Sequence, residues 1–588
     1  ICACLVGSEM CIRDRYKERY YICNLTYRLL MGSIFYMERN GQKYAYESTS
    51  VRVPGRKNPK TIKTYLGRVD PETGKIIPKE SRSRPKEEYA KHYGSVRFLD
   101  GIQKDMGIFE DLDEVFTTLA PNIMGAAMAL AINPTSMDSI HYTVENTVIR
   151  ETMKLRGTLS PSTMGTVCED VGGMMNTMDR FFTRRIARSS SGFFSLDLTS
   201  VSTYSKMGGW AQWGHNRDGE DLKQTNIAMV TDGDGIPVMF RMLPGSIADM
   251  AVMKDTVRDM KDMGCKGRMV MDRGFESAAN VSALMDLDMD FTMPSNVKAE
   301  PIKKLMSKAI DELKASSSFA FHEGKAYKYA EYEVGVIDTE DGYEYIVEVP
   351  RNHRDSAAVN ERFAKARKLK AFVVFDPSKA SDDITKMMSM VSETEMRLEN
   401  TKHRDPELTY RKLPPFVRRY LDYTVDDDGY MHIERKQNAF TFADNRAGMF
   451  VMLASSGTTF DQMMTSYDVR DWVEKAFDVY KNELEGDRNN TGNPERARGR
   501  LFIKFIALMM RIRIQNVLRD HDRDVLRTKA KKDSVNGMSV SELLLSLNTV
   551  FAIGNTGDWR LTHISKNIRE IFSVFGLEQM ESGQIVLG

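Results

Sequence analysis

Residues 193–199 read Phe-Phe-Ser-Leu-Asp-Leu-Thr, and they begin the segment that decides the fold. The run is typical of a buried strand, yet it carries an acid, Asp197, in its middle. Residues 226–230 and 236–240 are two more apolar runs on either side of an Asp-Gly-Asp-Gly turn, which predicts a hairpin. A lone acid among apolar neighbours is costly unless it is paired or binds a metal. Asp197 is therefore a candidate functional residue.

A second acid stands at the end of a second apolar strand. Residues 267–272 read Gly-Arg-Met-Val-Met-Asp, and Arg273-Gly274 then turns the chain toward a helix. Helices expected at about 249–262 and 277–286 flank this strand, and a further strand is expected at 290–294. Strands that alternate with helices predict an α/β core over residues 191–296.

A third acid lies on a helix that we expect from about residue 459 to 485. Residues 467–474 read Tyr-Asp-Val-Arg-Asp-Trp-Val-Glu. Four polar residues begin at Tyr467 and follow at offsets of 3, 7 and 14 residues. At about 100° per residue, their side chains fall within a roughly 60° arc of one helix face. They are Tyr467, Arg470, Glu474 and Lys481. A stripe of one acid, two bases and a phenol suits metal and phosphate better than a core.

These residues together suggest phosphodiester chemistry. Acids on two strands and one helix can converge on two divalent ions about 3.5–4 Å apart. Mg²⁺ prefers a few carboxylates plus water and phosphate oxygens. Arg470 can hold a phosphate through two hydrogen bonds, while Lys481 can follow a DNA backbone as a point charge. The common alternative for such a stripe is a solvated face with ion pairs four residues apart.

The segment between the second and third acids predicts an insertion at residues 297–457. Residues 326–334 and 343–349 alternate with period two, and 372–375 is a third strand, with charged helices between them. Residues 450–454 then form a buried strand that rejoins the core, whose second part we place at 458–520.

The regions that flank the core are expected to comprise a small β-rich region, a helical domain and a helical C-terminal region. Residues 31–88 contain short basic strands and a Pro/Lys/Ser-rich linker, and 521–588 is predicted to be a helical C-terminal region. Residues 89–190 are predicted to be a helical domain whose exit, 184–188, is basic. Two interpretations of it stay open, a DNA-binding domain and a packing domain with solvated charges.

The composition limits the class of protein through its charge, its cysteines and its apolar runs. The chain has 588 residues with 83 Lys+Arg and 82 Asp+Glu, so net charge gives no nucleic-acid signal. Six cysteines without a Cys-x2-Cys pair argue against a zinc ribbon or disulfide framework and favour a reducing cytoplasm. The most apolar run, 123–132, is shorter than the about 20 residues that span a bilayer, so we expect no membrane segment. Residues 1–30 contain a stretch similar to translated sequencing adapter and are expected to be artefactual or disordered, the alternative being a real basic segment.

The chain resembles DDE transposases of prokaryotic insertion sequences, in the insertion-sequence-four superfamily. That superfamily carries a Tyr-x2-Arg-x3-Glu-x6-Lys signature, and residues 467–481 match each spacing. Asp197 lies in a similar Ser-Leu-Asp-Leu-Thr-Ser context and Asp272 in Met-Asp-Arg-Gly. Residues 214–217, 221–224 and 243–246 are also similar, and the resemblance covers roughly residues 190–520.

The resemblance implies an RNase H-like mixed-sheet core interrupted by a strand-rich insertion. It also implies two Mg²⁺ ions, replaceable by Mn²⁺, held by the catalytic residues Asp197, Asp272 and Glu474. Tyr467, Arg470 and Lys481 would then contact DNA. The implied partners are terminal inverted repeats and target DNA, bound by a homodimer at the nucleoid in the cytoplasm. Some relatives excise through a DNA hairpin with the help of an aromatic residue of the insertion. No tryptophan lies there, which leaves Phe440, Phe442 or Phe450.

Two further functions remain alternatives to an active transposase. One is a decayed or domesticated copy that binds DNA without cutting it. The other is an RNase H-like nuclease in repair or defence, which the Tyr-Arg-Glu-Lys signature disfavours. The presence of all three acids argues against the decayed copy, and a structural or interaction protein without enzymatic activity is the least favoured interpretation.

Overall fold

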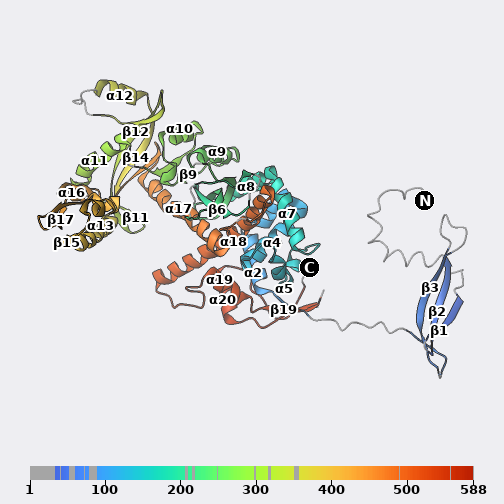
Figure 1. Ribbon diagram of the computed structural model, residues 1–588. Coiled ribbons are helices and arrows are strands. Elements are labelled where there is room, and N and C mark those ends of the chain that lie inside the picture. The colour runs from blue at the N-terminus through green and yellow to red at the C-terminus, as the bar shows by residue number, and fades with distance from the viewer. Residues whose placement is uncertain are drawn as a thin grey trace. The chain divides into compact units, whose positions relative to one another are not determined.

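The computed structural model describes most of the chain as two compact units, Ile1–Glu87 and Glu88–Gly588 (Figure 1). The described residues are 33–39, 41–51, 60–71, 73–78, 89–205, 209–214, 219–247, 249–296, 299–315, 319–349, 356–488, 490–555 and 558–586. The segment predicted to be artefactual, residues 1–30, and most of the predicted linker lie outside these residues.

The first unit is a four-stranded antiparallel sheet in the order β1-β2-β3-β4. Its strands are β1 (Ser33–Arg39), β2 (Gln42–Val51), β3 (Lys60–Val69) and β4 (Ile76–Pro78). Gly41 adopts a φ of 72° in the β1–β2 turn, a conformation that glycine reaches without steric cost. A β-bulge interrupts the β2–β3 ladder between Ala45 and Tyr46.

The second unit begins with a short strand and then helices. They are β5 (Tyr89–His92), α2 (Gly94–Asp105), α3 (Ile108–Phe116), η2 (Thr117–Leu119), α4 (Ala120–Ile132), α5 (Ile140–Asn146), α6 (Ile149–Thr152), α7 (Pro161–Gly173) and α8 (Met175–Arg188). The predicted Ser-Pro start of a helix is present, because Ser160 caps α7 by accepting a hydrogen bond from the Thr163 amide.

The stretch Ile108–Ile132 is long and apolar enough to cross a membrane by length and composition. In the structure it is divided into α3, η2 and α4, and Thr117 has a φ of 44° at the break. The residues of α4 from Ile123 to Ala131 are buried in the main hydrophobic core. This is the burial pattern of a core helix.

A long helix, α18 (Pro494–Thr528), runs through the second unit and packs against α7, α4, α2 and β8 (Figure 1). The contact between α18 and α7 requires glycines. A Cβ at Gly499 would collide with the carbonyl oxygen of Cys168, and a Cβ at Gly172 would collide with the carbonyl oxygen of Glu495. A cluster of phenylalanine rings joins α3, α8, β8 and α18, with centroids 5.3–6.5 Å apart in neighbouring pairs: Phe116, Phe181, Phe182, Phe240, Phe502 and Phe505.

A ten-stranded mixed sheet forms the centre of the second unit, in the order β11-β12-β14-β18-β10-β9-β6-β7-β8, with β13 beside β12. Its first part consists of β6 (Phe193–Thr203), β7 (Lys223–Asp232), β8 (Pro237–Pro244), β9 (Arg268–Met271) and β10 (Phe291–Pro294). Strands β6, β9 and β10 are parallel, while β6-β7-β8 is an antiparallel meander. Helices α9 (Asp249–Asp262) and α10 (Ala278–Asp286) connect the strands.

The insertion extends this sheet rather than forming a separate one. Strand β18 (Met449–Ser455) pairs with both β10 and β14 (Arg367–Phe375), and β12 (Lys325–Thr339) continues the ladder to β11 (Ala320–His322) and β13 (Gly342–Ile346). Two helices, α11 (Glu300–Ala315) and α12 (Ser356–Lys365), accompany these strands.

A small lobe is formed by the residues between β14 and β18. It comprises α13 (Pro377–Leu398), β15 (Thr401–Lys402), α14 (Pro406–Arg411), α15 (Pro415–Arg418), β16 (Leu421–Val425), β17 (Tyr430–Arg435) and α16 (Gln437–Asp444). Its own hydrophobic cluster includes Val391, Tyr420 and Phe440. Figure 1 shows these elements gathered together.

The predicted helix from 459 to 485 is α17 (Phe460–Asp478) followed by one π-helical turn, Val479–Glu483. It begins with a capping box in which Thr459 and Gln462 exchange hydrogen bonds. A regular 100° step therefore holds for Tyr467, Arg470 and Glu474 but not through to Lys481, which lies in the wider π turn. Such turns recur at functional sites.

The prediction of a helical C-terminal region is wrong in part. Helices α19 (Val540–Leu547) and α20 (Lys566–Val574) are present, but so are β19 (Phe551–Asn555), β20 (Asp558–Leu561) and β21 (Gln584–Ile585). These strands form a four-stranded sheet with β5, and α18 continues past residue 520. The strands are only two to five residues long and their partner lies about 460 residues earlier, so no local pattern announces them.

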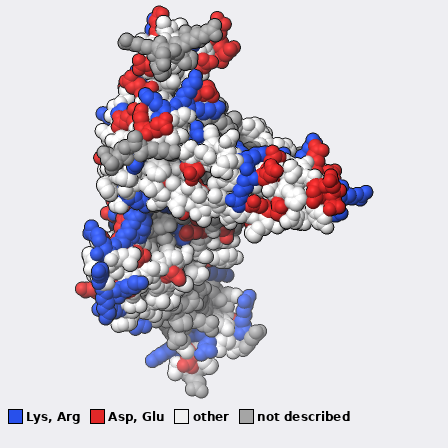
Figure 2. All heavy atoms as spheres, turned by 90° about the vertical axis from the view of Figure 1, so that its left-hand side faces the viewer, with Lys and Arg blue, Asp and Glu red and all other residues white. Residues whose placement is uncertain are grey.

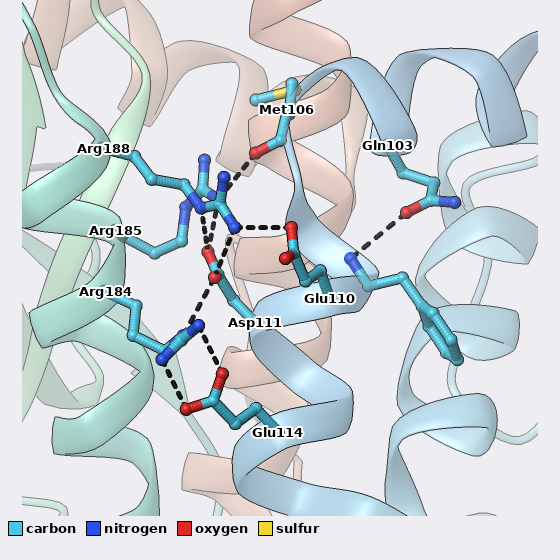
Figure 3. Close-up of polar contacts among 9 residues, drawn as sticks. Gln103, Met106, Glu110, Asp111, Glu114, Arg184, Arg185 and Arg188 are labelled. Atoms are coloured by element: carbon cyan, nitrogen blue, oxygen red, sulfur yellow. Dashed lines mark hydrogen bonds and ion pairs between the residues drawn. The ribbon is translucent and has the colours of Figure 1, made fainter.

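The basic end of α8 is engaged within the protein (Figure 3). The Asp111 carboxylate of α3, which is inaccessible to solvent, accepts hydrogen bonds from Arg184, Arg185 and Arg188 at 2.8–3.0 Å. Burial lowers the pKa of Arg185, while its hydrogen bond to Asp111 acts in the opposite direction. These contacts favour the packing interpretation for the basic exit, and they fix the helix that leads into β6.

Candidate active site

Two of the predicted acids are neighbours across a parallel ladder. Leu196 of β6 pairs with Met271 of β9, and each is followed by an acid: Asp197 within β6 and Asp272 directly after the end of β9. Adjacent strands lie about 4.8 Å apart, and residues at matching positions share one face of the sheet. Leu196 and Met271 are buried, whereas both acids are partly exposed on the opposite face.

Helix α17, which carries the third predicted acid, packs against β6, β7, β9 and β10. Ser195 lies two residues before Asp197 on β6. Its hydroxyl donates a hydrogen bond of 3.4 Å to the Arg470 carbonyl oxygen. Glu474 lies one turn beyond Arg470 and is exposed. The structure thus brings the helix that bears Glu474 onto the strands that bear Asp197 and Asp272.

Arg470 is held at the junction between helix and sheet. Burial works to lower its pKa, but a 2.9 Å hydrogen bond to Asp471, together with the nearby charges of Tyr467 and Asp272, leaves the pKa raised. Its Nε is buried and makes no hydrogen bond with the described residues. The side chain as a whole is 22% exposed, so Arg470 places a positive charge near Asp272 that would suit an anionic group.

Tyr467 is fixed by aromatic contacts. Its ring stacks on that of Phe450 in β18, with centroids 5.1 Å apart and planes at 20°, and the Arg470 guanidinium lies 5.0 Å from the Tyr467 centroid. The Lys379 ammonium lies 5.3 Å from the Phe450 ring on the insertion side. The stack therefore couples the insertion strand β18 to the helix of the third acid.

Lys481 lies in the π turn, which α18 holds in place. Arg511, whose side chain is only 1% exposed, contacts Glu483 and donates a 2.9 Å hydrogen bond to the Ser541 hydroxyl. Lys504 donates to the Glu485 carbonyl oxygen at 2.6 Å, just beyond the turn. Lys481 is half-buried and has contacts of its own.

The three acids offer oxygen ligands only, which is the donor set that Mg²⁺ and Mn²⁺ prefer. Asp197 and Asp272 are partly accessible to solvent, and Glu474 is exposed. Their donor chemistry would suit a divalent metal, but the group of possible ligands that lies within 4.8 Å of one another among the described residues is a different one, given below. A cavity of about 590 Å³ lies at the other end of β9 and β10, and none of the three acids lines it.

A second group of possible metal ligands lies beside Tyr467, and sequence reasoning missed it. His322, Glu323 and Asp468, in the described part of the chain, have ligand atoms that all lie within 4.8 Å of one another. The His322 Nε2 lies 2.7 Å from the Asp468 Oδ2. The partners are 146 residues apart in the sequence, so no local motif signals the contact. It fastens the β11–β12 turn of the insertion to α17.

The molecular surface shows no single-sign field on the face drawn in Figure 2. Lys and Arg side chains are interspersed there with Asp and Glu side chains. This agrees with the net charge of +1 and means that any DNA contact depends on local groups rather than on the whole surface.

Comparison with known families agrees with this arrangement. The model of a family described as "Transposase DDE domain" matches residues 188–510, which begin at the end of α8 and extend into α18. No curated protein matches the chain. The matched region contains β6, β9 and α17, and it spans more than half of the chain. The chain therefore belongs to the DDE transposase family, whose members are DNA-transposition enzymes that use divalent metal ions.

Proposed function

We propose that this chain is a transposase of the insertion-sequence-four superfamily that cleaves DNA at the ends of its element and joins them to target DNA. The catalytic residues in this proposal are Asp197, Asp272 and Glu474. The observation that carries it is the pairing of Leu196 with Met271, because this register makes two acids neighbours beneath the helix that carries the third.

The strand arrangement supports an RNase H-like core. The order β8-β7-β6-β9-β10 combines an antiparallel three-strand meander with two strands parallel to its first member. An acid within the first strand, an acid after the fourth and an acid on a helix across the sheet follow the order that such a core requires.

The protein's own groups have distinct tasks in this reaction. Asp197, Asp272 and Glu474 supply carboxylate oxygens, and Arg470 supplies a guanidinium to a phosphate of the cleaved strand. Lys481 and the Tyr467 hydroxyl bind the DNA backbone on the same helix. Mg²⁺ ions held by these carboxylates would activate the attacking oxygen and stabilise the leaving one.

The proposed active form is a homodimer that holds two inverted-repeat ends. For the hairpin route, the three candidate phenylalanines differ in exposure. Phe440 is buried, Phe450 stacks on Tyr467, and Phe442 is 55% exposed with the Arg446 guanidinium 3.6 Å from its ring. Phe442 is therefore the ring available to hold a displaced base.

Strand cleavage and strand transfer on DNA that contains the element ends, with Mg²⁺ or Mn²⁺, test the proposal. The variants Asp197→Asn, Asp272→Asn and Glu474→Gln should each lose at least about 100-fold in cleavage rate while still binding the ends. Asp461→Asn, an exposed acid in the first turn of α17, serves as the matched control. DNA binding without cleavage by the unaltered chain would instead support a decayed copy, and full activity of any acid variant would refute the site.

A further inference from the structure

The N-terminal sheet has two chemically different faces. Side chains alternate along strands, so the pairing register assigns each residue to a face. One face, here called the ring face, carries four aromatic rings, a methionine and three cations: Phe35, Met37, Arg39, Tyr44, Tyr46, Lys63, Tyr65 and Arg68.

The rings form a continuous patch across β1, β2 and β3. Phe35 stacks on Tyr46 with centroids 5.6 Å apart, and Tyr65 contacts both Tyr46 at 5.3 Å and Tyr44 at 6.1 Å. The Lys63 ammonium lies 5.1 Å from the Phe35 centroid. Such cross-strand pairs stabilise a sheet that has few other apolar contacts.

The two faces carry different charges: the ring face has cations only among its described strand residues, and the opposite face also has acids. The acids of the described strands, Glu38 and Glu47, both lie on the opposite face. Glu38 stands directly across from Lys43 in the β1–β2 register. Arg39, Lys63 and Arg68 are exposed on the ring face without an acid among its described strand residues. Residues 33–78 as a whole contain nine Lys or Arg and four Asp or Glu, for a net charge of +5 in a chain of net charge +1.

The ring face is not a closed core. Ala45 and Val69, both on the opposite face, are the buried hydrophobic residues among those described in this unit. Tyr65 is 37% and Met37 39% exposed. The patch therefore presents aromatic surface and positive charge together.

This combination selects the kind of partner. A second copy of the same face would bring like charges together, which disfavours self-association. Aromatic rings beside cations on an open sheet are the features with which proteins bind unpaired nucleic-acid bases and their backbone, and duplex bases are not available for such stacking. We propose that the ring face binds single-stranded DNA. The inference rests on this unit's own surface and not on the proposed active site.

Fluorescence anisotropy of the full chain with a fluorescein-labelled 20-nucleotide oligothymidine tests this, without divalent metal so that cleavage plays no part. Tyr65→Leu should weaken binding about fivefold or more, because stacking on one ring contributes roughly 1–3 kcal/mol. Tyr65→Phe should retain binding. Lys63→Gln and Arg68→Gln, both at exposed positions, should each lower the slope of log affinity against log salt by about 0.7.

The opposite face provides matched controls. Tyr36→Leu and Lys43→Gln alter an exposed tyrosine and an exposed lysine of the same sheet and should leave binding unchanged. Equal effects from the two faces would overturn the proposal. So would a Tyr65→Leu variant that binds the single strand normally, or one whose only change is its oligomeric state. A loss that is as large for a 20-base-pair duplex as for the single strand would also overturn it. A triad variant such as Asp272→Asn should bind the single strand normally, which separates this inference from the catalytic one.

Discussion

The Ser195 hydroxyl of β6 donates a hydrogen bond to the Arg470 carbonyl oxygen of α17. Ser195 is completely buried, so this contact sets the distance between the strand of Asp197 and the helix of Glu474. A small side chain is therefore required here for close approach of the two elements.

Replacing Ser195 with leucine should displace α17 and disable cleavage. The larger side chain overpacks the contact at a cost of about 1–3 kcal/mol, and a misplacement near 1 Å can cost about 100-fold in rate. Single-turnover cleavage and duplex binding would be measured together, with binding expected to change little. Ser195→Ala should remain close to the parent. A leucine variant with normal cleavage would show that the contact does not position Glu474.

Lys481→Ala should weaken DNA binding and lower its salt dependence, with the log–log slope falling by about one. The reason is the loss of one ammonium beside the DNA backbone. Lys475→Ala is the matched control, because the Lys475 ammonium lies 4.1 Å from the Trp472 ring and is off the polar stripe. Affinity would be measured by anisotropy from low to moderate salt. Identical slopes for the parent and Lys481→Ala would remove Lys481 from the DNA contact.

Asp111→Asn should destabilise the second unit strongly. The variant leaves the buried guanidinium of Arg185, with its side chain 6% exposed, without its counter-charge, and breaking such a pair costs about 3–5 kcal/mol. Urea unfolding gives the free energy. Glu114→Gln, which removes a carboxylate that is 54% exposed and pairs with Arg184, should cost no more than about 1 kcal/mol. Similar losses for the two variants would contradict the structural role assigned to Asp111.

Asp232→Asn should stabilise the protein at neutral pH. Burial raises the pKa of Asp232 to about 6, against the backbone hydrogen bonds from Ile236 and Asp234. Between about pH 4 and 6 the folded state binds the proton that the unfolded state has released, so stability falls as pH rises. Above pH 6 the cost is on the order of 2–3 kcal/mol. Asparagine keeps the acceptor for both amides and removes that cost.

Thermal unfolding from pH 4 to 8 checks this expectation. The parent should lose stability across the lower half of the range relative to Asp232→Asn, and the variant should melt higher at pH 7.5. Asp234→Asn, in the same turn, is the control. A variant that is less stable than the parent at pH 7.5 would show that the ionised Asp232 carboxylate is favourable in the turn.

The central strands and the α17 helix could be predicted because their signals are local. The Asp-Gly-Asp-Gly turn, the apolar runs that contain Asp197 and end at Asp272, and the capping box at Thr459 each lie within a few residues of the element that they define. The strands and the helix expected from these signals are present in the structure. Burial of one face of a strand or helix imposes a regular spacing of apolar residues, and that spacing can be recognised in the sequence.

Other features depend on contacts between distant residues. The pairing of Phe551 with His92, the contact of His322 with Asp468 and the capture of three arginines by Asp111 leave no periodic trace. The π turn at Lys481 likewise has no sequence signal, because α18 holds it through Glu483 and Glu485. Basic residues 184–188 look like a DNA-binding surface in the sequence only because their acidic partner lies more than 70 residues earlier.

The burial of α4 against α18 has a consequence for synthesis. Arg511 donates a hydrogen bond to the Ala131 carbonyl oxygen, 380 residues earlier in the chain. At roughly 5–20 residues per second, the apolar surface of α4 waits roughly 20–80 s on the ribosome before α18 emerges to cover it. Apolar surface left exposed in this way is prone to aggregate. A copy of the gene truncated before α18 should therefore yield a product whose α4 lacks this cover.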